Sequence, residues 1–239
     1  MRKFKEYLIG GAVRDEILGL SNKDLDYVFV FEDLDKNQTT EECFNDMYRN
    51  IQERGEIFLC TPSCYTIRYK DKTTKEVKDV VMARKEVGYI PGTRTPIVVP
   101  GSLYDDLERR DFTLNALAKD EDGNIIDYFN GLEDLKHGML RTPLDCKITF
   151  DDDPLRILRA VRFSITKKFS MSRSIVEEIF TYDYESKMSV VSNERIREEL
   201  FKCFKHDTLK TLVTLEEFYR LRNYVFKNNN LWLKPTLEQ

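Results

Sequence analysis

Two aspartates set one residue apart are the residues of this sequence whose type and spacing point most directly to chemistry. Asp24 and Asp26 lie in the run Asp24-Leu25-Asp26-Tyr27. Side chains alternate across a strand, so both carboxylates project from one face, about 7 Å apart at the backbone. Two such carboxylates can share hard cations, and two Mg²⁺ ions roughly 3.5–4 Å apart could bridge an attacking hydroxyl, a phosphate and its leaving group. Asp24 and Asp26 are therefore candidate catalytic metal ligands.

A glycine pair upstream supplies a phosphate site to go with them. Gly10 and Gly11 open a short helix predicted over 12–18, and Arg14 follows near its start. Backbone N–H groups and the helix dipole at such a turn can hold a triphosphate, and Arg14 could reach its β- or γ-phosphate. An Asp-x-Asp run alone is common at turns and caps, so the glycine turn is what favours nucleotidyl transfer.

One further acidic residue is a candidate for the metal site. Asp79 lies near the start of a later strand, predicted over 77–82. It could be a third carboxylate beside the pair, and it could equally be an exposed acid at a strand end.

An aspartate and an arginine farther along the chain could read a nucleobase. Asp153 precedes Pro154, which predicts a helix N-cap with proline at N1, and Arg156 follows on the adjoining surface. Adenine and cytosine present a donor and an acceptor in one order on their pairing edges, whereas guanine and uracil present the reverse. The wrong base would leave buried polar groups unpaired, at about 1–3 kcal/mol per group. Arg159 and Arg162 would brace this pair, face phosphate or decorate the helix surface.

Two regions with different patterns of predicted secondary structure must position these residues. The first alternates strands with helices, with strands predicted over 7–9, 25–31, 56–60, 65–70 and 77–82 and helices over 12–18 and 39–51. The stretch 86–102, rich in glycine and proline, predicts a long loop. From Pro154 onward only helical patterns are convincing, over 154–168, 172–182, 192–205 and 208–227. The sequence thus predicts an α+β region followed by a helical one.

Bulk properties exclude several classes of protein. With 239 residues, 41% hydrophobic and 33% charged, the composition is that of a globular protein, without an apolar run that could span a bilayer. The N-terminus lacks the apolar core of a signal peptide, so we expect a cytoplasmic protein with no membrane contact. The five cysteines are scattered, which favours neither disulfides nor a zinc site. The net charge of −4 does not mark a nucleic-acid binder, although the basic run from Arg156 to Arg173 could face phosphate or solvent.

Five motifs stand in the order of one known family. They are Leu8–Asp15 with Asp24–Asp26, Arg109–Ala116, Asp127–Leu135, Asp152–Phe163 and Glu194–Leu200.

The sequence resembles the bacterial-type (class II) tRNA nucleotidyltransferase and poly(A) polymerase family over about residues 7 to 205. The resemblance implies a polymerase-β-like head with a mixed, mostly antiparallel sheet over 1–142, an all-α neck over 143–205 and a truncated helical body over 206–239. It further implies that Asp24 and Asp26 hold the metals and that Gly11 and Arg14 touch the triphosphate. By the same resemblance, Arg110 contacts the nucleotide and Asp111 senses the ribose 2′-hydroxyl.

The function that fits these expectations is addition or repair of the 3′-terminal CCA of tRNA, with two Mg²⁺ ions as cofactors and ATP and CTP as substrates. Alternatives within the family are poly(A) addition and partial CC- or A-addition. Outside it stand a non-catalytic RNA-binding module and nucleotidylation of a small molecule or protein. Because few residues follow the last motif, we expect a homo-oligomer or a partner to compensate in holding the tRNA.

Overall fold

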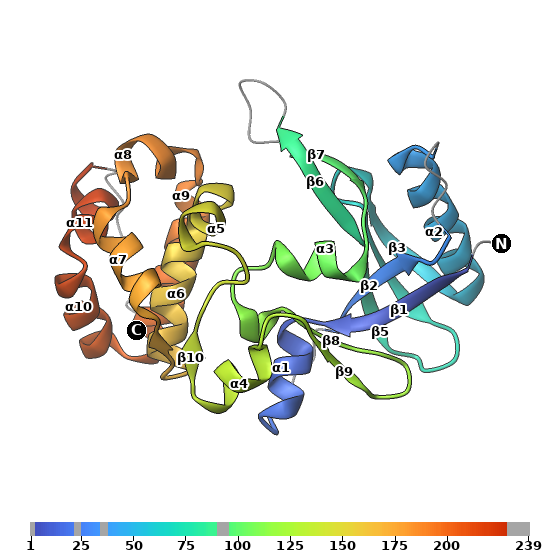
Figure 1. Ribbon diagram of the computed structural model, residues 1–239, viewed down its shortest axis with the longest axis horizontal. Coiled ribbons are helices and arrows are strands. Elements are labelled where there is room, and N and C mark those ends of the chain that lie inside the picture. The colour runs from blue at the N-terminus through green and yellow to red at the C-terminus, as the bar shows by residue number, and fades with distance from the viewer. Residues whose placement is uncertain (1–2, 22–24, 34–37, 90–95, 229–239) are drawn as a thin grey trace, which may run out of the picture. The chain divides into compact units, whose positions relative to one another are not determined.

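The computed structural model describes residues 3–21, 25–33, 38–89 and 96–228. Contacts within the chain divide it into two compact units, residues 1–132 and 133–239 (Figure 1). The boundaries predicted for a head, a neck and a body stay a prediction. None of the helices in these ranges combines the length and the apolar character that crossing a bilayer requires.

A seven-stranded sheet forms the framework of the first unit. Its order is β3 (Gly55–Thr61), β4 (Thr66–Asp71), β5 (Val77–Met82), β2 (Asp26–Phe31), β1 (Phe4–Ile9), β8 (Leu117–Lys119) and β9 (Ile125–Asp127). Only β2 and β5 run parallel, and all other neighbours in this sheet are antiparallel. The predicted mixed, mostly antiparallel sheet is confirmed.

One face of this sheet is covered by α2 (Thr40–Arg54), as Figure 1 shows. The helix begins with a capping box, in which Thr39 Oγ1 accepts the Glu42 N–H and Glu42 Oε2 accepts the Thr39 N–H. Its buried Met47 and Ile51 belong to the same apolar cluster as Phe29 of β2. The odd-numbered residues of β2 therefore face α2, and its even-numbered residues face the other side.

The other face carries the short helix α3 (Leu103–Glu108), which buries Leu103 and Leu107 in a cluster with Val28. The helix α1 (Gly11–Ile17) follows β1 directly, and the 3₁₀ turn η2 (Thr113–Asn115) precedes β8. This face is the one from which Asp26 projects, since Asp26 and Val28 lie two residues apart on one strand.

The predicted loop over 86–102 is wrong, because β6 (Arg84–Tyr89) and β7 (Pro96–Pro100) pair as an antiparallel ribbon. Val87, Ile97 and Val99 are all exposed on this ribbon. None of the ribbon residues whose burial is described is fully buried, so no clear alternation of apolar and polar residues marks these strands in the sequence.

Helices make up most of the second unit. They are α5 (Cys146–Asp152), α6 (Leu155–Thr166), α7 (Arg173–Thr181), α8 (Tyr184–Lys187), α9 (Asn193–His206), α10 (Thr208–Glu217) and α11 (Tyr219–Asn223), after α4 (Gly131–Lys136), which spans the unit boundary. The helix predicted over 208–227 is interrupted at Phe218, whose ψ of 56° is not helical. The expected absence of strands is also wrong, because β10 (Met139–Leu140) pairs with β11 (Ser170–Met171).

Candidate active site

Asp26 begins β2 and is exposed on the sheet face that carries α3. Register places the glycine turn beside it, because Leu8 near the end of β1 pairs with Tyr27 near the start of β2. Asp24 lies outside the described residues, so its predicted position next to Asp26 stays a prediction.

Asp79 lies opposite Asp26 on the neighbouring parallel strand β5. Its backbone N–H donates to the carbonyl oxygen of Leu25 at 3.1 Å, which fixes this register. Residues paired across neighbouring strands share a face, so the two carboxylates project from the same side. Both Asp79 oxygens also accept hydrogen bonds from Arg68, from Nε at 2.8 Å and from Nη2 at 2.6 Å.

The donor chemistry of this strand end fits a hard divalent cation, since carboxylate oxygens are the ligands that Mg²⁺ prefers. Asp26 and Asp79 supply two such groups on adjacent strands. Among the described residues, which do not include Asp24, no three acidic, cysteine or histidine side chains are grouped so that they could hold a metal ion.

Gly10 forms the turn between β1 and α1 with a φ of +71°, a region that strongly favours glycine. A Cβ atom at this position would lie 2.7 Å from Nη1 of Arg110. Gly11 is the first residue of α1 and is partly buried. The missing side chain at Gly10 thus lets the guanidinium of Arg110 approach the turn that was predicted to hold phosphate.

Arg110 is held in place by a buried carboxylate. Asp106 is fully buried, and its two oxygens pair with Arg109 Nη2 at 2.6 Å and Arg110 Nη2 at 3.2 Å. Burial raises the pKa of Asp106, but attraction to Arg109 and Arg110 outweighs burial, so the pKa lies below its usual value. Asp106 therefore stays ionised and orients Arg110, a role that sequence analysis missed.

Arg14 and Asp111 belong to one chain of hydrogen bonds. Arg14 is buried, and it donates to Asp15 Oδ1 from Nε at 2.9 Å and to Asn115 Oδ1 from Nη1 at 2.5 Å. Asn115 Nδ2 then donates to Asp111 Oδ1 at 2.9 Å. These hydrogen bonds connect α1 to the turn before β8. Asn115 thus fixes the orientation of Arg14 and Asp111, the two residues predicted to contact the nucleotide.

In the second unit, Asp153 lies between α5 and α6 with both oxygens engaged. Oδ1 accepts the Leu155 N–H at 3.2 Å, and Oδ2 pairs with Arg195 Nη2 at 2.9 Å. The α6 N-cap falls at Pro154, whose backbone angles are already helical. Asp153 has extended backbone angles and its carboxylate accepts the Leu155 N–H, so the capping contact predicted for Asp153 is present. Arg156 donates to the carbonyl oxygen of Thr149 at 3.1 Å.

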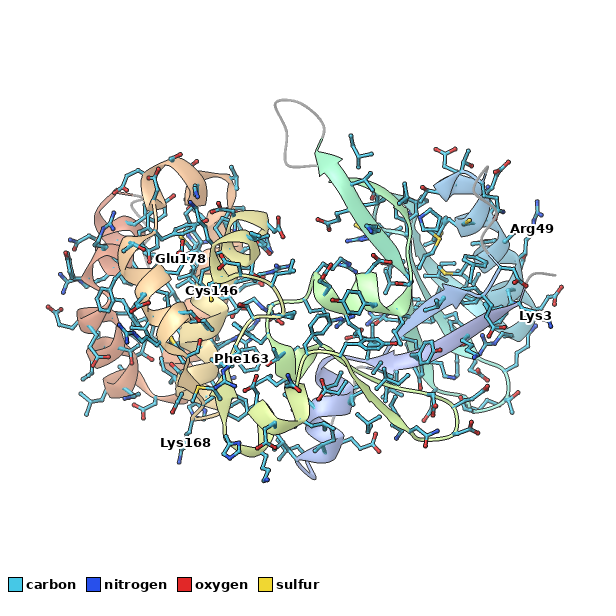
Figure 2. The ribbon with its side chains drawn as sticks, viewed as in Figure 1. Lys3, Arg49, Cys146, Phe163, Lys168 and Glu178 are labelled. Carbon is cyan, nitrogen blue, oxygen red and sulfur yellow. The ribbon has the colours of Figure 1, made fainter. Side chains whose placement is uncertain are left out.

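The next two arginines of α6 both lie near the ring of Phe163. The guanidinium carbons of Arg162 and Arg159 lie 4.4 Å and 6.0 Å from the ring centroid of Phe163, a residue labelled in Figure 2. Arg162 Nε also donates to the buried Glu199 of α9 at 2.5 Å. This pair ties α6 to α9, and the three roles considered for Arg159 and Arg162 stay predictions.

Two residues of the last motif make contacts that sequence analysis did not single out. Arg195 pairs with Asp153 between α5 and α6, and the buried Glu199 pairs with Arg162 of α6, whereas Glu194 and Arg197 are exposed. The buried stripe that includes Ile196 marks the face of α9 that packs along α6; Glu199 belongs to this stripe and Arg195 lies next to Ile196. The helical phase of the apolar residues could have found them.

Comparison with known proteins identifies the family. Residues 6–141 match the poly(A) polymerase head domain, and the chain belongs to this family of nucleotidyltransferases. The expected polymerase-like head, followed by helices, is confirmed.

Its relatives include proteins named for CCA addition. The chain is 35% identical to the multifunctional CCA protein of Nitrosomonas eutropha, over 82% of this chain and 43% of that protein. The fold is similar to the Bacillus stearothermophilus CCA-adding enzyme in complex with CTP, with a TM-score of 0.71 and 27% identity over 89% of this chain and 47% of that one. It is also similar to a tRNA nucleotidyltransferase complexed with a primer tRNA and an incoming ATP analogue, with a TM-score of 0.70 and 29% identity over 94% and 60%. The chain spans less than half the length of the curated relatives it matches.

Proposed function

We propose that this protein adds or repairs the 3′-terminal CCA of tRNA without a nucleic-acid template, using CTP and ATP and releasing pyrophosphate. The observation that carries the proposal is the placement of Asp26, in register with Asp79 and beside the Gly10 turn that Arg110 approaches. The names of the relatives and neighbouring structures support it. A cytoplasmic location and a homo-oligomer or a partner that helps to hold the tRNA stay predictions.

Asp24 and Asp26 would hold Mg²⁺ at the start of β2. When bound there, Mg²⁺ would lower the charge repulsion between the attacking 3′-hydroxyl, the α-phosphate and the leaving pyrophosphate. Arg110 is oriented by Asp106 toward the Gly10 turn, where its guanidinium can bind the triphosphate through paired N–H groups. Asp111 is oriented by its hydrogen bond from Asn115 and is the group proposed to accept a hydrogen bond from the ribose 2′-hydroxyl.

Asp153 and Arg156 would act as the protein's template. The Asp153 carboxylate accepts a hydrogen bond from the amino group of adenine or cytosine, and Arg156 donates to the neighbouring ring nitrogen. Asp153 is about three-tenths exposed, so a base can reach it while Arg195 holds its second oxygen. Guanine and uracil would set a carbonyl oxygen against the carboxylate, which is repulsive.

Incorporation into a defined tRNA tests this function. A tRNA that ends before CCA is incubated with the protein and Mg²⁺, with each nucleoside triphosphate singly and in combination, and the 3′ ends are sequenced. We expect CC with CTP alone, CCA with CTP and ATP, and no addition of G or U. An unlimited A tail would favour poly(A) polymerase instead. Retained tRNA binding without any incorporation would replace the proposal by a non-catalytic RNA-binding module.

A further inference from the structure

A row of four side chains crosses the sheet at the level of Asp26. Strand register pairs Leu59 with Arg68, Arg68 with Asp79, and Asp79 with Asp26. Residues paired in this way share one face of the sheet, here the face opposite α2. Leu59 is 53% exposed at the edge of the sheet, so the row is open to solvent on that side.

Within this row, Arg68 and Asp79 form a two-pronged ion pair. Each Asp79 oxygen receives one guanidinium N–H, at 2.8 Å and 2.6 Å. The side chains are 42% and 24% exposed, so the pair is reachable from solvent. A carboxylate whose two oxygens are both engaged by arginine is a poor ligand for a cation at Asp26, because its charge is already compensated.

We propose that Arg68 is a positioning residue. Its ion pair keeps Asp79 away from the metal site until a phosphate of the RNA strand binds the Arg68 guanidinium in place of Asp79. Phosphate and carboxylate both offer paired oxygens that match the arginine fork, so one can replace the other. Once released, Asp79 becomes a third carboxylate facing the cation held by Asp26. This inference rests on the proposed function, because it requires that metal site.

The strand order shows why the RNA strand, rather than the triphosphate, reaches Arg68. In the order β4, β5, β2, β1, Arg68 lies on one side of Asp26 and the Gly10 turn lies on the other. In-line displacement places the attacking and leaving oxygens on opposite sides of the α-phosphorus. With the triphosphate bound near Gly10 and Arg110, the RNA terminus must approach from the side of β4 and Arg68.

The state in which Arg68 pairs with Asp79 is tested by measuring Mn²⁺ binding to the full chain by electron paramagnetic resonance, without nucleotide or RNA. Arg68→Gln should tighten Mn²⁺ binding at least about threefold, because it frees an acidic ligand. Asp79→Asn should not tighten Mn²⁺ binding, because it frees no acidic ligand and leaves Arg68 without its counter-charge, and the double variant should lose the gain seen in Arg68→Gln. Arg49→Gln is the matched control, because Arg49 makes only a 3.8 Å surface pair with Asp46 on α2 (Figure 2).

A short RNA with a 3′-deoxy end, which cannot react, tests the exchange. It should tighten Mn²⁺ binding to the wild type and the Arg49 control, but not to Asp79→Asn. Unchanged Mn²⁺ affinity in a folded Arg68→Gln variant would overturn the proposal, as would an RNA effect that persists in Asp79→Asn. Asp26→Asn separates the metal site from the role of Arg68. If this variant binds Mn²⁺ as the wild type does, the metal site is refuted and the proposed function fails with it. If it loses Mn²⁺, the metal site stands, and the Arg68 and Asp79 variants decide only the role of Arg68.

Discussion

Neutralising the buried carboxylate of Asp106 should destabilise the head and disorder its nucleotide-binding arginine. The change Asp106→Asn keeps the shape of the side chain but leaves Arg109 and Arg110 without their shared counter-charge. Breaking a buried ion pair costs about 3–5 kcal/mol, but these arginine side chains are 23% and 20% exposed and can gain some hydration. We therefore expect the free energy of unfolding at pH 7 to fall by about 2–4 kcal/mol.

The pH dependence of this loss provides the sharper test. Because the folded pKa of Asp106 is lowered, its contribution to stability is present above the unfolded pKa and is lost as the pH falls through the folded pKa. Urea unfolding of the wild type and Asp106→Asn should thus differ most at neutral pH, and the difference should shrink in acid. Asp46→Asn, at a surface pair, should change stability by less than about 1 kcal/mol. A difference that stays constant with pH would refute the reasoning.

Three further expectations concern single side chains. Arg195→Ala should raise UTP incorporation relative to CTP about five- to tenfold, because Arg195 orients the Asp153 carboxylate through a charge-assisted hydrogen bond. Arg197→Ala, on the exposed side of α9, should not change this ratio, and competition assays between UTP and CTP measure both variants. Gly10→Ala should lower Tm and raise the KM for CTP, because the new methyl group meets the guanidinium of Arg110; an unchanged KM would contradict this. Burial raises the pKa of the Cys203 thiol to about 12, so iodoacetamide at pH 8 should label exposed Cys64 first and Cys203 only upon unfolding, as peptide mass mapping would show.

Local patterns predicted those elements whose burial is regular. The capping box and apolar stripe of α2 and the alternation along β2 lie within one segment each, so sequence alone located them. No ribbon residue of β6 and β7 with described burial is fully buried, and no pattern in the neighbouring residues predicts the non-helical backbone angles of Phe218. Irregular or exposed structure therefore escaped the analysis.

Within the candidate site, motif spacing predicted the acidic residues but not the side chains that contact them. Spacing indicated Asp26 and Asp153, because each belongs to a short run with its own chemistry. Arg68 reaches Asp79 only through the pairing of β4 with β5, and Arg195 reaches Asp153 only because α9 packs along α6. The Arg68–Asp79 contact depends on the register of a hairpin whose partners lie 11 residues apart, and the Arg195–Asp153 contact depends on packing between residues 42 apart. Neither contact is encoded in the spacing of a single motif.

The parallel contact between β2 and β5 has a consequence for synthesis on the ribosome. Antiparallel neighbours can be joined by a tight turn, but parallel strands need a crossover, here the long excursion through α2, β3 and β4. A nascent chain that has emerged only as far as β4 therefore holds Asp26 without its acidic neighbour. The pairing of Asp26 with Asp79 would therefore form only when β5 inserts between two strands that are already made.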